Sequence, residues 1–243
     1  MSILRKQKQS DVTFYCFTPV VSLATFFIEF LLAFYVLFKY KLTKFGNLTV
    51  ATLLCLGTFQ LTEFLICTTS YGDLATKVGY IAITLLPALG IHSITVIARK
   101  NNLMVISAYI YAALLVVGII FIPDINLQTS CMPLYVDVKV SDWFSILHYF
   151  YYAFYVFGAI YITLNSLRKH IGDAKEEKWL ILAYAAFLVP SEGLFFLRII
   201  SSTAVPSVMC AFAVFTAIIL VLFVMPRQHQ LELRKRKSKS KRR

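Results

Sequence analysis

Charged residues are scarce in this sequence. Only 15% of its 243 residues are Asp, Glu, Lys or Arg, whereas about a quarter of a soluble domain is charged. Hydrophobic residues make up 59% of the chain, which is more than one soluble core of this size can bury. Disorder is excluded as well, because disordered segments have low hydrophobicity. The composition therefore indicates a polytopic membrane protein.

Acidic residues are scarcer than basic ones: there are 12 Asp and Glu against 24 Lys and Arg, and the formal charge is +12. The tail from Arg227 to Arg243 has nine basic residues and one acid, so it carries +8. Because the tail directly follows an apolar run, the membrane interpretation is favoured, and the first expectation is a topology anchor that keeps the tail inside. Contact with anionic lipid head groups or RNA and a docking site for an acidic partner are the alternatives, with lipid expected as the partner and nucleic acid disfavoured. The expected membrane-surface residues are Arg234, Lys235, Arg236 and Lys237.

Long apolar runs dominate the rest of the chain. A membrane helix needs about 20 mostly apolar residues, and helices are expected because lipid offers no partner to an unpaired backbone group. Seven runs are long enough, which predicts an all-α bundle of seven transmembrane helices between an external segment, 1–16, and a basic cytoplasmic tail, 226–243. The predicted spans are Phe17–Phe38, Leu48–Thr68, Val78–Ala98, Leu103–Ile122, Trp143–Leu167, Trp179–Ile199 and Ala204–Met225.

The distribution of Lys and Arg over the connections predicts the orientation. One alternate set of connections, with the tail, holds eighteen basic residues, and the other set holds six. The positive-inside rule places the richer set in the cytoplasm. The N-terminus is then outside and the C-terminus inside. Prolines support the predicted helix limits, because Pro123 and Pro226 follow apolar runs, whereas Pro87 and Pro190 lie inside spans and are candidate kinks.

Several signatures of catalysis are missing. The longest connection, Asp124 to Asp142, leaves no room for a soluble catalytic domain, and there is no Walker A, GxGxxG, CxxC or GxSxG pattern. Only four His are present and no Asp lies within a span, which disfavours a membrane hydrolase with a metal site. The last span has no lysine for a retinal Schiff base. We therefore expect no enzyme, no cofactor and no metal.

A few polar residues interrupt the apolar runs, and such residues are costly in lipid and mark functional sites by default. Gln60, Glu63 and Cys67 share one helical face, and so do His148 and Tyr152 on the fifth span. These two faces predict an outward-open pocket of acidic and aromatic groups. The alternatives are that a buried Glu is simply protonated or pairs with a Tyr or His to hold helices together, and that the Tyr-rich start of the fifth span is an interfacial aromatic belt. The predicted ligand-binding residues are Gln60, Glu63, His148, Tyr152 and Glu192, and Glu29 and His92 are further intramembrane polar groups.

Three of the five cysteines, Cys16, Cys67 and Cys131, map near the outer face. One pair among them can oxidise in an oxidising compartment, and three free thiols are the alternative. Cys55 and Cys210 lie within spans, where cysteine behaves as a small buried hydrophobe. The sequence does not choose a pair.

Two stretches carry a resemblance to a known family. The first is Phe59-Gln60-Leu61-Thr62-Glu63-Phe64, followed by a span that opens with Tyr80 and contains Pro87, and the second is Asp142-Trp143-Phe144 before a Tyr-rich span. This order of spans resembles the seven-helix N-terminal membrane sensory region of microbial histidine kinases. The resemblance implies a sensory or ligand-binding bundle, but without the kinase part, because the chain stops soon after the last span.

The sequence as a whole predicts a multi-pass integral membrane protein of a plasma or cell membrane. The expected function is that of a sensor or receptor-like module, which binds an unknown small ligand from the outer side and signals through inner loops or the tail to a separate protein. A small transporter or channel is the main alternative, and it requires a polar path across both leaflets that includes Glu29 and His92. An intramembrane hydrolase is disfavoured.

Overall fold

The computed structural model describes residues 17–40, 43–69, 71–98, 102–122, 125, 128–131, 136–169, 174–200 and 204–231. The external segment 1–16 with Cys16, and the tail residues Arg234, Lys235, Arg236 and Lys237, lie outside the described residues. The predictions made for them therefore stay predictions.

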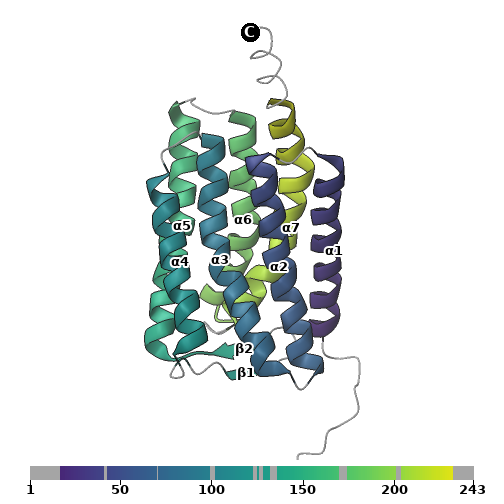
Figure 1. The fold of residues 1–243 in the computed structure, drawn as a ribbon, viewed down its shortest axis with the longest axis vertical. Helices are drawn as coiled ribbons and strands as arrows, with labels where there is room; N and C mark the ends of the chain where they lie inside the picture. Colours follow the sequence, from purple (N-terminus) through teal and green to yellow (C-terminus); the bar gives the residue numbers. More distant parts are fainter. Residues whose placement is uncertain are drawn as a thin grey trace, which may run out of the picture.

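Seven long helices and one small hairpin form the described part of the chain (Figure 1). The helices run side by side along the long axis, and the hairpin lies at the end of the bundle opposite the C-terminus. The elements in chain order are α1 (Phe17–Lys39), α2 (Lys44–Thr68), α3 (Gly72–Ala98), α4 (Leu103–Phe121), β1 (Gln128–Cys131), β2 (Val136–Lys139), α5 (Asp142–Lys169), α6 (Ala174–Phe196) and α7 (Val205–Ile219).

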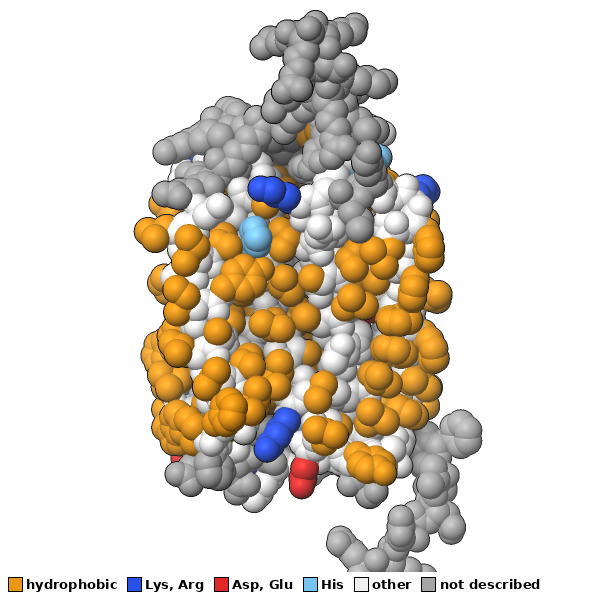
Figure 2. Space-filling model, in the orientation of Figure 1, with side chains coloured by type: hydrophobic (Ala, Val, Ile, Leu, Met, Phe, Trp, Pro, Cys, Tyr) orange, Lys and Arg blue, Asp and Glu red, His pale blue; other side chains and the backbone are white. Residues whose placement is uncertain are grey.

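All seven helices are long and apolar enough to cross a membrane, which confirms the predicted number of spans. On the face seen in Figure 2, apolar side chains form a broad band across the middle, and charged side chains lie near the two ends. Such a band is the surface that a bilayer core requires. The fold is that of a multi-pass membrane protein.

Helix α3 is the most deeply buried span and packs against α2, α4 and α5. Small residues on α3 let its neighbours approach closely, as is common where membrane helices pack. Gly79 shows this best, because a Cβ atom placed there would lie 2.4 Å from Oγ1 of Thr62 on α2. Helix α1 completes the bundle by packing between α2 and α7.

The connection between α4 and α5, for which the sequence analysis predicts no secondary structure, contains the antiparallel hairpin of β1 and β2. Cys131 at the end of β1 forms a disulfide with Cys67 of α2, with the two Cα atoms 5.5 Å apart. The pair that the sequence left open is therefore Cys67–Cys131. On β2, Val136 is buried and its backbone N–H donates to Oγ of Ser207 on α7 over 3.2 Å. These two attachments hold the hairpin over the end of the bundle.

The last helix is longer than predicted. The chain continues as helix through Pro226 to Leu231, whereas the sequence suggests an end before this proline. A π-helical segment, Leu220–Val224, explains the difference. There the N–H of Met225 bonds to the carbonyl of Leu220, five residues back, and this wider turn leaves the helix able to continue past a residue that has no N–H.

Candidate functional site

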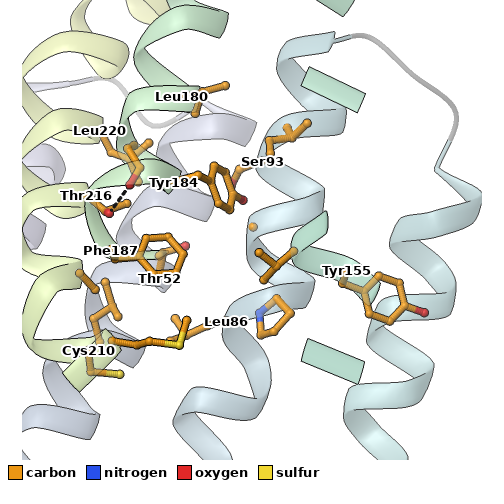
Figure 3. A pocket seen from close by; sticks show the side chains of 18 of the residues that line it. Thr52, Leu86, Ser93, Tyr155, Leu180, Tyr184, Phe187, Cys210, Thr216 and Leu220 are labelled. Atoms are coloured by element: carbon orange, nitrogen blue, oxygen red, sulfur yellow. Dashed lines mark hydrogen bonds between the residues drawn. The ribbon is translucent and has the colours of Figure 1, made fainter. Parts of the chain in front are cut away.

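A cavity of about 90 Å³ lies inside the bundle, between α2, α3, α5, α6 and α7. Most of its wall is apolar or aromatic. Figure 3 shows Tyr184 and Phe187 of α6 projecting toward the space that Leu86 and Ser93 of α3 border from another side. The remaining wall includes Thr52, Leu56, Pro87, Gly90, Ile94, Tyr152, Tyr155, Val156, Leu180, Ala183, Met209, Cys210, Ala213, Thr216 and Leu220.

Three of the hydroxyl groups in the cavity wall belong to tyrosines, of which Tyr155 donates to Oγ of Ser107 over 3.0 Å. Tyr152 and Tyr184 also line the cavity, and within the described residues neither hydroxyl has a hydrogen-bond partner. Thr216, by contrast, is satisfied, because its hydroxyl donates to the carbonyl of Ala183 over 2.7 Å (Figure 3). Buried hydroxyl groups normally have partners. The hydroxyl groups of Tyr152 and Tyr184 can therefore form hydrogen bonds with a ligand that carries a polar group.

The helix that forms one wall of the cavity is interrupted by Pro87, which removes one backbone hydrogen bond from α3. Tyr151 of α5 reaches this place, and its hydroxyl donates to the carbonyl of Thr84 over 2.9 Å. The break at Pro87 is thus a local irregularity of α3 that a neighbouring side chain stabilises. The cavity therefore has a wall with a local break in its hydrogen-bond ladder.

His148 lies beside this break and not beside Glu63. Its Nε2 is 3.1 Å from Oγ1 of Thr84, and the Thr84 hydroxyl donates its own hydrogen to the carbonyl of Tyr80 over 2.7 Å. Since that hydrogen is already used, Nε2 of His148 must be the donor, which assigns the tautomer. His148 is buried and joins α5 to α3. In this arrangement the ring donates to the Thr84 hydroxyl.

Gln60 and Glu63 are both buried on α2, as their shared face suggests, but Glu63 faces α1 and α7. The hydroxyl of Ser22 on α1 donates to Oε2 of Glu63 over 3.0 Å, and Ser207 of α7 lies against the same carboxyl group. Glu29 of α1 is fully buried near this group. The structure thus brings Glu29, Gln60 and Glu63 together in a second polar site.

The other predicted residues lie apart from both sites. Glu192 on α6 is half-buried and makes no hydrogen bond or ion pair with any described residue. His92 is on α3, where its Nδ1 is 3.2 Å from the hydroxyl of Tyr109 on α4. Of the predicted ligand-binding set, only Tyr152 lines the cavity. Within the described ranges, no three His, Cys, Asp or Glu side chains come together as metal ligands would.

Sequence reasoning missed most of the cavity wall, including Tyr184, Phe187 and Cys210. These residues are aromatic or small and sit in apolar runs, so in a sequence they look like ordinary packing residues. Pro87 was the available signal, because an intramembrane proline marks a helix that needs support from its neighbours. Comparisons with known proteins add no assignment: no protein-family model matches the chain, and no curated protein matches it significantly.

Proposed function

We propose that this protein is a sensor-type membrane module that binds a small, mainly apolar molecule in the cavity between α2, α3, α5, α6 and α7. The observation that carries the proposal is the combination of an apolar wall with two phenols, Tyr152 and Tyr184, that have no hydrogen-bond partner among the described residues. Ligand sites are typically apolar cavities with a few polar groups that fix orientation. A short alkyl chain or ring with one hydroxyl or carbonyl group suits this wall.

The break in α3 at Pro87 and the π-helical segment of the last helix support a signalling role. Both border the cavity, because Pro87 and Leu220 are part of its wall. Intramembrane proline breaks and π-helical turns are common where helices change shape. A ligand that binds one packing of these helices more tightly raises the population of that packing. The inner ends of the helices then move. The proposed output is a separate protein that contacts the inner loops or the tail.

The proposed orientation, with the hairpin outside, has support from two independent features. The Cys67–Cys131 disulfide lies at the hairpin end, and disulfides persist in oxidising compartments. Eighteen of the basic residues belong to the other end by sequence. This orientation is compatible with the proposed location in a plasma or cell membrane and with the sensory family that the sequence resembles.

We prefer a sensor to a transporter because the polar groups do not form one path. Glu29 lies between α1 and α2, whereas His92 bonds to Tyr109 between α3 and α4. An enzyme is not proposed, because the described part of the chain shows no nucleophile activated by a base: the hydroxyl next to His148 is the one that donates to Tyr80.

Cys210 gives a direct test, because it lines the cavity and is free. With Cys16 and Cys55 replaced by Ser, the protein in nanodiscs is treated with methyl methanethiosulfonate, and modification of Cys210 is followed by intact mass spectrometry. A panel of short-chain alkyl phenols and alcohols is then added. We expect at least one compound to slow modification and to raise the melting temperature.

The control pair is Ala213→Leu and Ala113→Leu. Ala213 lines the cavity, whereas Ala113 on α4 is exposed on the surface of the bundle. Ala213→Leu fills the cavity and abolishes both effects, and Ala113→Leu leaves both unchanged. The proposal fails if no compound protects Cys210, or if protection persists in Ala213→Leu.

A further inference from the structure

The second polar site has unsatisfied oxygen atoms in a fully enclosed place. Neither carboxylate oxygen of Glu29 has a hydrogen-bond partner among the described residues, and the same is true of both amide atoms of Gln60 and of Oε1 of Glu63. The three side chains are 0%, 0% and 2% exposed. Buried polar atoms are almost always satisfied, so a concentration of exceptions requires an explanation.

The three side chains occupy one small region between α1, α2 and α7. Oε2 of Glu29 lies 3.9 Å from the position of a Cβ atom at Gly57, one helical turn from Gln60 on α2. Gln60 in turn lies one turn from Glu63, and the two carboxyl groups interact electrostatically with each other and with the thiol of Cys210. Gln60 therefore lies on α2 between Gly57, which Glu29 approaches, and Glu63.

Positive protein groups do not neutralise the site. Among the described residues, neither Glu29 nor Glu63 forms an ion pair, and the neighbours of the carboxyl groups are the hydroxyls of Ser22 and Ser207 and the Cys210 thiol. A buried carboxylate without a partner is strongly unfavourable. The charge must be cancelled by a proton on each carboxyl group or by a bound cation.

We propose that Glu29, Gln60 and Glu63 form an oxygen-donor site for one divalent cation of the Ca²⁺ type. A single divalent ion neutralises both carboxylates. The two carboxylates, the Gln60 carbonyl and the Ser22 and Ser207 hydroxyls are hard oxygen donors, and Ca²⁺ accepts about 6–8 of these in flexible geometry. Mg²⁺ suits the site less well, because it retains several waters and demands strict octahedral geometry.

The hairpin gives this site a defined cover. Ser207, which lies against Glu63, accepts the N–H of Val136 from β2, and the disulfide anchors β1 one turn beyond Glu63 on α2. A cation that enters from the hairpin side therefore passes beneath the hairpin. The inference does not depend on the proposed function, because the cation site and the cavity share only Cys210.

The test uses the full chain in nanodiscs, first treated with EGTA and then given CaCl₂ at constant ionic strength. We expect saturable binding of one radioactive Ca²⁺ per chain in equilibrium dialysis and a parallel rise in melting temperature. Glu29→Gln and Glu63→Gln should each weaken Ca²⁺ binding by about tenfold or more, since each removes a ligand charge. NaCl in place of CaCl₂ should have no such effect.

Matched controls separate this site from surface carboxylates. Glu192→Gln and Asp73→Asn change one half-buried and one exposed carboxyl group and should leave Ca²⁺ binding unchanged. The dialysis of the wild-type chain remains decisive even if a Gln variant does not fold. The proposal is overturned by the absence of Ca²⁺ binding, by equal stabilisation with NaCl, or by Gln variants that bind as the wild type does. Gln variants that are more stable than the wild type with and without Ca²⁺ would also overturn it and identify a protonated carboxyl pair.

Discussion

At the scale of single residues, Tyr151 has the clearest structural role. Its hydroxyl donates to the carbonyl of Thr84 and lies against the backbone N–H of Ala88, on either side of the break that Pro87 causes in α3. The ring also stacks on Tyr111 of α4, with centroids 5.2 Å apart. One side chain thus connects α5 to α3 and α4 next to the break at Pro87.

Replacing Tyr151 by Phe should lower the free energy of unfolding by about 1 kcal/mol, because hydrogen bonds between membrane helices contribute about that much or less. The measurement is unfolding in mixed micelles followed by circular dichroism. Tyr149→Phe is the matched control, since this phenol is 65% exposed on the same helix. Equal stability of Tyr151→Phe and the wild type would show that the hydroxyl does not support α3.

Residue spacing along α2 predicted which residues share a buried face, but it did not predict which helix packs against that face. The interval between Gln60 and Glu63 placed both on one face of α2, and both are buried there. The spacing within one helix cannot show which helix packs opposite. Glu63 consequently meets Ser22 of α1, and His148 meets Thr84 of α3, so the two predicted faces do not share a pocket.

At the scale of elements, the approach of α2 to α3 depends on Gly79. The position has no room for a methyl group, because Thr62 fills the space and its hydroxyl is fixed by a bond to the carbonyl of Phe59. Thr62 is β-branched and cannot easily rotate away. This contact holds the most buried helix of the bundle in place.

We predict that Gly79→Ala destabilises the protein by about 1–3 kcal/mol, which is the usual cost of overpacking. Gly193→Ala on α6 is the control, since a Cβ atom there has no atom within 4 Å. Melting temperatures of both variants in the same detergent provide the comparison. A Gly79→Ala protein as stable as Gly193→Ala would contradict the close approach of α2 and α3.

The limits of the helices were predictable to different degrees. The predicted Leu103–Ile122 and the observed α4, Leu103–Phe121, nearly coincide, because the apolar thickness of a bilayer fixes the length of the run. The end of α7 was wrong, because a π-helical turn accommodates Pro226. The hairpin was missed, since its strands are four residues each and have no strong turn signal.

At the scale of the whole molecule, the proposed orientation can be measured directly. A variant in which Ser replaces Cys16, Cys55 and Cys210 keeps the Cys67–Cys131 disulfide and has no other thiol. Lys139→Cys on β2 and Lys178→Cys on α6 then report the two ends separately. We expect a membrane-impermeant maleimide to label Lys139→Cys in intact cells and Lys178→Cys only after lysis. The opposite pattern would reverse the orientation.

The arrangement of five helices around one cavity is the feature on which the proposed function depends. Its wall combines residues from distant parts of the chain, such as Thr52 and Thr216, so no local pattern could have shown it. Of the predicted ligand-binding residues, Tyr152 is the one that lines the cavity. The proposed function therefore requires that a ligand occupy this cavity.

The most direct measurement is the dissociation constant of a protective phenol or alcohol for the wild type, Ala213→Leu and Ala113→Leu in nanodiscs, determined by calorimetry. We expect similar affinities for the wild type and Ala113→Leu, and an affinity weaker by about tenfold or more for Ala213→Leu, which corresponds to about 1.4 kcal/mol. Equal affinities for all three proteins would show that the molecule binds elsewhere and would contradict the account.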